Sequence, residues 1–145
     1  MGVDPGVNGG IAVLDSRGGV AFVHGLNSSM TEDEALEIAY AATTALHKCG
    51  GVECFFEKVH HMTGDGGKGS HTFGYIKGAL RGALKARGVF LRDVPPQLWQ
   101  AKMECLTGGN KNVSKRRAIE LFPGLKVTHA IADALLIALY GQTLK

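Results

Sequence analysis

The chain has 145 residues, a size typical of one domain, and its 45% hydrophobic and 20% charged residues are ordinary for a globular protein. This composition argues against a disordered chain, and the length argues against a two-domain enzyme. No apolar run reaches the ~18 residues that a membrane span needs. Three cysteines without a CxxC pair cannot build a disulfide framework, which favours a reducing compartment.

The first part of the chain predicts three strands, a helix and a fourth strand. Short apolar runs over 2–4, 11–14 and 20–23 are separated by tight turns, which is typical of an antiparallel meander. Thr31 begins a capping box with Glu34, and the helix that follows is expected to end at Gly50-Gly51. A strand is expected over 52–59 and a Gly-rich basic loop over 60–70. The expected apolar face of the helix is Leu36, Ile38, Ala39, Ala42 and Leu46.

The second part predicts one more strand and several helices. A helix is expected over 72–87 and a fifth strand over 89–91, ended by Pro95-Pro96. Further helices are expected over 97–106, 114–121 and 128–140. The element order is βββαβαβ followed by helices, and we expect a single domain over 1–145.

Three acidic residues lie in apolar surroundings. Asp4 ends the first strand, Glu57 follows two phenylalanines on the fourth, and Asp133 lies inside the apolar last helix. Buried carboxylates are unfavourable unless they are paired or bind a metal, and hard oxygen ligands suit Mg²⁺ or Mn²⁺. The three could therefore converge on a cation. His129 precedes Asp133 by four residues on the same helix face and is a candidate ligand or proton-transfer group.

Each of these residues also has a purely structural interpretation. Asp4 can cap a turn, and Glu57 can point outward from an edge strand. Asp133 can be an acid favoured near a helix N-terminus, and an isolated His129 would be structural or exposed.

Charge is distributed unevenly along the chain. Residues 1–66 hold nine acidic and three basic residues, whereas 67–145 hold four acidic and thirteen basic ones. This asymmetry indicates a polyanionic partner contacted mainly by the second half, although solvated helix faces explain the charges equally well.

The basic residues of the second half are candidate phosphate contacts. Lys77, Arg81 and Lys85 form a stripe along the second helix. Lys115 to Arg117 are expected in the first turn of their helix, where cations oppose the dipole and bound phosphate would explain them; plain surface positions are the alternative. The candidate contacts with this polyanionic partner are Lys68, His71, Phe73, Lys77, Arg81, Lys111, Ser114, Lys115, Arg116 and Arg117.

The loop after Glu57 is rich in glycine and histidine. The spacing of His60, His61 and His71 does not match a tetrahedral zinc site. The loop instead suits entry into the polyanionic partner; if that partner is a nucleic acid, Phe73 or a histidine could stack on an opened base.

Gly74, Gly78 and Gly82 recur every four residues along the second helix. Glycine inside a helix costs about 1 kcal/mol relative to alanine, so the repeat indicates that another backbone comes close. That backbone belongs either to a second copy of the chain at a two-fold interface or to the protein's own sheet.

Three segments resemble the motifs of RuvC-type Holliday junction resolvases, in the order of that family. They are Gly2-Val3-Asp4-Pro5-Gly6-Val7-Asn8-Gly9-Gly10-Ile11-Ala12, Phe56-Glu57-Lys58-Val59 and His129-Ala130-Ile131-Ala132-Asp133-Ala134-Leu135-Leu136-Ile137-Ala138. The resemblance implies an α/β ribonuclease H-like fold with a mixed five-stranded sheet flanked by helices. It also implies a Mg²⁺-dependent endodeoxyribonuclease that acts as a homodimer and resolves four-way DNA junctions by paired symmetric nicks, leaving 5′-phosphate ends.

The same resemblance implies roles for the candidate residues. Asp4 would bridge two Mg²⁺ ions, for which Mn²⁺ would substitute, while Glu57 and Asp133 would each bind one. His129 would complete the second site or move a proton to or from the attacking water. Ala130 stands where many bacterial members carry a further acid, and His129 lies one residue upstream.

Two other segments resemble the phage and monokaryotic-chloroplast branch of the family. These are Lys111-Asn112-Val113-Ser114-Lys115-Arg116 with Leu121-Phe122-Pro123, and Val94-Pro95-Pro96-Gln97-Leu98-Trp99. The first strand is unusually short, so we expect that residues are missing ahead of Met1. This favours a protein of the chloroplast nucleoid without its transit peptide, with a phage-encoded protein in a bacterial cytoplasm as the alternative.

Three other function classes compete with a resolvase. A sugar-kinase or actin-like ATPase needs two such domains, which this length cannot supply. A non-catalytic junction-binding module is disfavoured because all three acids are present. A ribonuclease H-like nuclease that cuts RNA or an RNA/DNA hybrid is poorly distinguished by the residues themselves.

Overall fold

The computed structural model of the chain describes residues 1–59 and 67–144, without the side chains of 67–70 and 72. Its strands are β1 (Gly2–Asp4), β2 (Gly10–Leu14), β3 (Val20–Gly25), β4 (Glu53–Glu57) and β5 (Phe90–Val94). They form one five-stranded sheet in the order β3-β2-β1-β4-β5. β1, β2 and β3 pair antiparallel, whereas β1, β4 and β5 run parallel, so the sheet is mixed.

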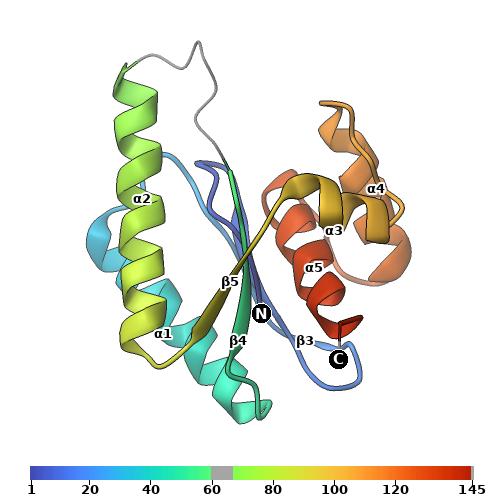
Figure 1. The fold of residues 1–145 in the computed structure, drawn as a ribbon, viewed down its shortest axis with the longest axis horizontal. Helices are drawn as coiled ribbons and strands as arrows, with labels where there is room; N and C mark the ends of the chain where they lie inside the picture. The colour runs from blue at the N-terminus through green and yellow to red at the C-terminus, as the bar shows by residue number, and fades with distance from the viewer. Residues whose placement is uncertain (60–66, 145) are drawn as a thin grey trace.

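Helices cover both faces of this sheet. α1 (Glu32–Lys48) and α2 (Gly67–Ala86) lie on one side, and α3 (Pro96–Lys102), α4 (Lys111–Leu121) and α5 (His129–Gln142) lie on the other (Figure 1). The order of strands and helices predicted from the sequence is confirmed. Among the described residues, none of the helices is long and apolar enough to cross a membrane.

Strand alternation separates two apolar cores, one on each face of the sheet. Ile11 and Phe56 pack against α1 and α2, whereas Ala12 and Phe55 pack against α5. Successive side chains of a strand point to opposite faces. Glu57, which follows Phe56, therefore lies on the α5 side of the sheet.

The first helix forms as predicted, with one change in its buried face. The Thr31 hydroxyl accepts a hydrogen bond from the Glu34 amide at 3.2 Å, and the Glu34 carboxylate accepts one from the Thr31 amide at 2.8 Å. Leu36 is 45% exposed, and Ile38 is only partly buried. Small residues such as Ala35 and Ala39 face the sheet instead, because they let the helix pack closely.

Several predicted boundaries were wrong by a few residues. α2 begins at Gly67 rather than at residue 72, and α4 begins at Lys111 rather than at 114. Glycine disfavours a helix by only about 1 kcal/mol, so it does not prevent this earlier start. Asn110 is the N-cap of α4, since its side chain accepts a hydrogen bond from the Asn112 amide at 3.0 Å. β5 extends to Val94 because its pairing with β4 continues that far.

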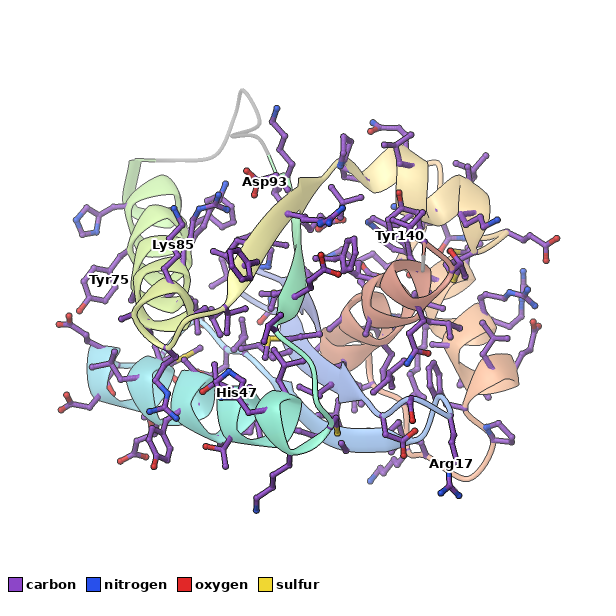
Figure 2. All side chains as sticks on the ribbon, turned by 60° about the horizontal axis from the view of Figure 1, so that its bottom comes forward. Arg17, His47, Tyr75, Lys85, Asp93 and Tyr140 are labelled. Carbon is purple, nitrogen blue, oxygen red and sulfur yellow. The ribbon has the colours of Figure 1, made fainter. Side chains whose placement is uncertain are left out.

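The glycine repeat of α2 lies on an open face of the helix. A Cβ atom added at Gly74, Gly78 or Gly82 would meet nothing within 4 Å in the described structure. Tyr75, between the first two glycines in the sequence, projects away from the sheet (Figure 2). Packing of the repeat against the protein's own sheet is therefore wrong, because the sheet lies on the other side of α2.

Candidate active site

Asp4 and Glu57 end two neighbouring parallel strands at the same edge of the sheet. Val3 is opposite Phe56 in the register of β1 and β4, so the next position along each strand sets Asp4 beside Glu57. Both residues are only 7% exposed. β4 lies between β1 and β5, so Glu57 is not on an edge strand, and the outward-pointing interpretation is wrong.

The glycine-rich turn after β1 closes around Asp4. The Gly6 amide donates a hydrogen bond of 2.9 Å to Oδ1 of Asp4, so the turn-capping interpretation is correct for this one oxygen. Gly9 lies so close to the backbone and carboxyl group of Asp4 that a side chain at this position would collide with both. The motif Asp-Pro-Gly-x-x-Gly therefore fixes the carboxylate in one orientation.

Asp133 reaches the same place from α5. The helix lies directly on β1 and β2. A Cβ atom added at Gly2 or Gly10 would collide with the backbone of α5, so glycine at these positions permits the close approach. Asp133 is the fifth residue of α5 and lies beyond the first turn, so it is not an N-terminal helix acid. Its Oδ1 is buried and accepts no hydrogen bond from the described residues.

Burial raises the pKa of all three carboxyl groups. The pKa of Glu57 rises to about 8 because the group is desolvated and faces the charge of Asp4. The pKa of Asp4 is raised by burial and by the charge of Asp133, against the hydrogen bond from Gly6. The pKa of Asp133 is raised by burial, although Ser114, Lys111 and His129 oppose the rise. The protein thus brings three acids together without enough counter-charge to offset the effect of burial on their pKa values.

His129 is the first residue of α5, and its side chain is exposed at the border of this cluster. Its charge lowers the pKa of Asp133, so the two groups interact across one helical turn as their spacing predicted. The structure thus brings Asp4, Glu57 and Asp133 together and leaves His129 beside them, in contact with solvent.

A residue that the sequence did not single out as a site residue also belongs to this cluster. Trp99 of α3 is fully buried, and its Nε1 donates a hydrogen bond of 2.9 Å to Oε1 of Glu57. The only signal in the sequence was a lone tryptophan after Pro95-Pro96. It lies in a segment that resembles the resolvase family, but the resemblance gave this tryptophan no role. The contact joins residues 42 positions apart, so no local pattern points to it.

α4 contributes two groups next to Asp133. Ser114 is buried, its hydroxyl lies 3.2 Å from the Lys111 carbonyl, and it also lowers the pKa of Asp133. The structure therefore places Ser114 with the acids rather than on a surface that DNA could contact. Lys111 is exposed in the first turn of α4, and its charge lowers the pKa of both Asp4 and Asp133.

Three of the expected DNA contacts are engaged inside the protein. Arg81 makes two hydrogen bonds with the Asp93 carboxylate, at 2.5 and 3.1 Å. Lys77 donates to the Val59 carbonyl at 3.1 Å and lies 5.4 Å from the centre of the half-buried Phe73 ring. Arg117 pairs with Glu104 at 2.8 Å and with Glu120 at 3.2 Å.

The remaining basic candidates are distributed over two helices. Lys115 and Arg116 lie in the second turn of α4 and make no ion pair within the described part of the chain. The expected first-turn position was wrong because α4 starts earlier; the first turn instead carries Lys111. His71 is exposed near the start of α2, and the side chain of Lys68 lies outside the described residues, as do His60 and His61.

The donor set suits a hard divalent cation. Three carboxyl groups converge, and a buried oxygen of Asp133 has no hydrogen-bond partner within the described structure, as a ligand position would require. No three Asp, Glu, His or Cys side chains within 1–59 and 67–144 are arranged to enclose one ion. Magnesium fits this incomplete shell, since it keeps several waters and takes only one or two carboxylates.

Sheet order, helix placement and the acids at the strand ends define the α/β ribonuclease H-like fold. The chain is similar to Thermus thermophilus RuvC in complex with a Holliday junction substrate, with a TM-score of 0.68, 18% identity, and coverage of 96% of this chain and 88% of that chain. A second Thermus thermophilus RuvC structure has a TM-score of 0.60, 18% identity, and coverage of 96% and 90%. No family model and no curated protein matches the chain. The predicted fold is confirmed, while the chloroplast or phage branch stays a prediction.

Proposed function

We propose that the protein is a metal-dependent endodeoxyribonuclease that resolves four-way DNA junctions by paired symmetric nicks. The observation that carries the proposal is the convergence of Asp4, Glu57 and Asp133 at one edge of the sheet. The fold is shared with a RuvC whose structure includes a Holliday junction substrate, which favours a junction over other polyanions.

The three acids would hold two Mg²⁺ ions, for which Mn²⁺ would substitute, with Asp4 shared between them. Such ions activate water and neutralise charge on the phosphoryl oxygens during phosphodiester hydrolysis. Asp4 is held in place by Gly6 and Glu57 by Trp99, so both present a fixed oxygen to the site. His129 is exposed beside Asp133 and would hold or move a proton at the rim of the site.

DNA would approach along α4 and the start of α2. Lys111 couples electrostatically to Asp4 and Asp133, so a phosphate bound there would lie near the acids. Lys115 and Arg116 continue the basic surface along α4 without an ion pair in the described structure. Phosphate contacts of this kind supply affinity without sequence preference.

Paired nicks require two active sites, which a homodimer would supply. The open glycine face of α2 is the proposed contact, because residues without side chains let two helices approach closely. Each subunit would cut one strand and leave 5′-phosphate and 3′-hydroxyl ends. A place in DNA recombination in the chloroplast nucleoid, or in a phage-infected bacterial cytoplasm, is part of the same proposal.

One gel assay tests the proposal against its alternatives. The protein is incubated with a labelled four-way junction, a duplex of the same sequence and an RNA/DNA hybrid, each with Mg²⁺ or EDTA. We expect two symmetric cuts in the junction with Mg²⁺ only. Cleavage of the hybrid alone would favour a ribonuclease, and binding of the junction without any cut would favour a non-catalytic module.

A further inference from the structure

Trp99 of α3 donates a side-chain hydrogen bond to Glu57. It is also the chain's single tryptophan. The indole is fully buried and has only one polar atom, Nε1, which lies 2.9 Å from Oε1 of Glu57. An indole N–H is a donor only, so it always presents a hydrogen to this oxygen and never competes with it for a proton or a cation.

The path of the chain from β5 into α3 places the indole next to Glu57. Glu57 is opposite Val94 in the register of β4 and β5, and the Lys58 amide donates to the Val94 carbonyl at 2.8 Å. Pro95 and Pro96 end β5 directly after this point and begin α3. The first turn of α3 then places Trp99 next to the side chain of Glu57, which pairs with Val94.

A hydrogen bond from α4 also holds the far end of α3. The Met103 carbonyl accepts a hydrogen bond of 2.9 Å from Nε of Arg117, which belongs to α4. Trp99 itself is packed in the apolar core that α3, α4 and α5 share on this face of the sheet. The donor therefore stands on a helix fixed at both ends, so Glu57 cannot rotate without losing its partner.

We propose that Trp99 is a positioning residue of the metal site. Its N–H occupies Oε1 of Glu57 and fixes the plane of the carboxylate, so that Oε2 is the oxygen presented to a divalent cation beside Asp4. This inference rests on the proposed function, since it takes Glu57 as a metal ligand. Outer-shell hydrogen bonds of this kind typically change metal affinity by 10–100-fold when they are removed.

A purely structural role for the same bond is the competing explanation. A buried indole N–H needs an acceptor, and any buried carboxylate would satisfy it. In that case its removal would lower stability but leave metal binding unchanged. Metal affinity and unfolding must therefore be measured on the same variants.

The test is calorimetric titration of the DNA-free protein with Mn²⁺ at a fixed pH, together with urea unfolding. Trp99→Phe keeps most of the ring and removes the N–H. We expect its Kd for Mn²⁺ to rise by 10–100-fold. Phe122→Leu is the matched control, because Phe122 lies in the same core and its replacement also removes ring volume there. We expect its Kd to match that of the unsubstituted protein.

A second replacement keeps the test decisive if the first variant does not fold. Trp99 exchanged for benzothienyl-alanine keeps the shape of the indole with sulfur in place of N–H, so its Kd decides the question if Trp99→Phe does not fold. Emission from the single tryptophan gives an independent measurement, since Mn²⁺ binding at Glu57 should change the emission of Trp99 with the Kd found by calorimetry.

The outcomes separate this inference from the proposed function. If the unsubstituted protein binds no Mn²⁺, both proposals are wrong. If it binds Mn²⁺ and the variant without the N–H binds equally well, only the role of Trp99 is wrong. A weaker Kd in that variant with an unchanged Kd in Phe122→Leu supports the role.

Discussion

Arg117 of α4 donates a hydrogen bond from Nε to the backbone carbonyl of Met103, 2.9 Å away at the end of α3. Its guanidinium also pairs with Glu104 and Glu120. Arg117 therefore links the helix that carries Trp99 to the helix that carries Ser114. The sequence placed Arg117 among the phosphate contacts, whereas the structure uses its hydrogen-bond donors internally.

Arg117→Gln should lower the free energy of unfolding by about 1–3 kcal/mol, because it leaves the Met103 carbonyl and two carboxylates with weaker partners. Urea unfolding measures the loss. The salt dependence of junction binding should stay the same, since Arg117 is not expected to contact phosphate. A shallower salt slope at unchanged stability would instead show that Arg117 contacts the DNA.

Lys115→Ala and Arg116→Ala should have the opposite effect. Neither residue makes an ion pair within the described structure, so stability should change little. Junction affinity should fall, and the slope of log K against log salt should become shallower by about 0.9 per lost phosphate contact. Fluorescence anisotropy of a labelled junction at several salt concentrations, without metal, gives both quantities. Unchanged slopes would make these residues plain surface cations.

Asp4→Asn, Glu57→Gln and Asp133→Asn should each reduce junction cleavage by about 100-fold or more, because each replaces a charged metal ligand by a neutral amide. Junction affinity should stay equal or increase, since each change also removes repulsion of phosphate. Single-turnover cleavage and metal-free binding separate the two effects. A variant that cuts at the normal rate would remove its residue from the site.

The metal-free protein should lose stability as the pH rises between 4.5, the ordinary pKa of a glutamate, and about 8, the pKa of Glu57 in the fold. In this window the folded state binds more protons than the unfolded state, so the slope of unfolding free energy against pH is negative. Asp4 and Asp133, whose pKa values are also raised, act in the same direction.

Thermal unfolding at several pH values, with EDTA or Mg²⁺, measures this effect. Glu57→Gln should flatten the slope, and Mg²⁺ should restore stability at high pH because it binds the deprotonated form. A stability that rises with pH in EDTA would contradict the raised pKa of the cluster.

Gly78→Leu should give a folded monomer if the open face of α2 is a two-fold interface. A Cβ atom at Gly78 meets nothing within 4 Å in the described subunit, so leucine there is not expected to disturb the fold itself. Gly78→Ala is the comparison, because alanine at an exposed helical position should add about 1 kcal/mol of stability. Sedimentation and thermal unfolding distinguish the cases: a Gly78→Leu protein that keeps the oligomeric state of the parent would place the interface elsewhere.

Much of the fold was predictable because its signals are local. The Thr31 capping box, the strand at Glu53–Glu57 and the turn after Asp4 depend on residues a few positions apart, and each formed close to where the pattern placed it. Acids inside apolar segments also pointed to a shared site, since a buried carboxylate is unfavourable alone. The sequence by itself therefore determined the order of elements and the identity of the central acids.

Tertiary structure decided the contacts that hold those acids. Trp99 meets Glu57 across 42 positions, and Arg117 meets Met103 across 14, through helices whose packing no periodicity specifies. The four-residue spacing of the glycine repeat made Gly78 equally compatible with packing in the core and with an open face of α2. Helical periodicity places residues on a common face, but it does not specify what that face contacts. Only the packing of α2 on the sheet decided that the glycines lie outside, and only the path from β5 into α3 brought an indole to the carboxylate.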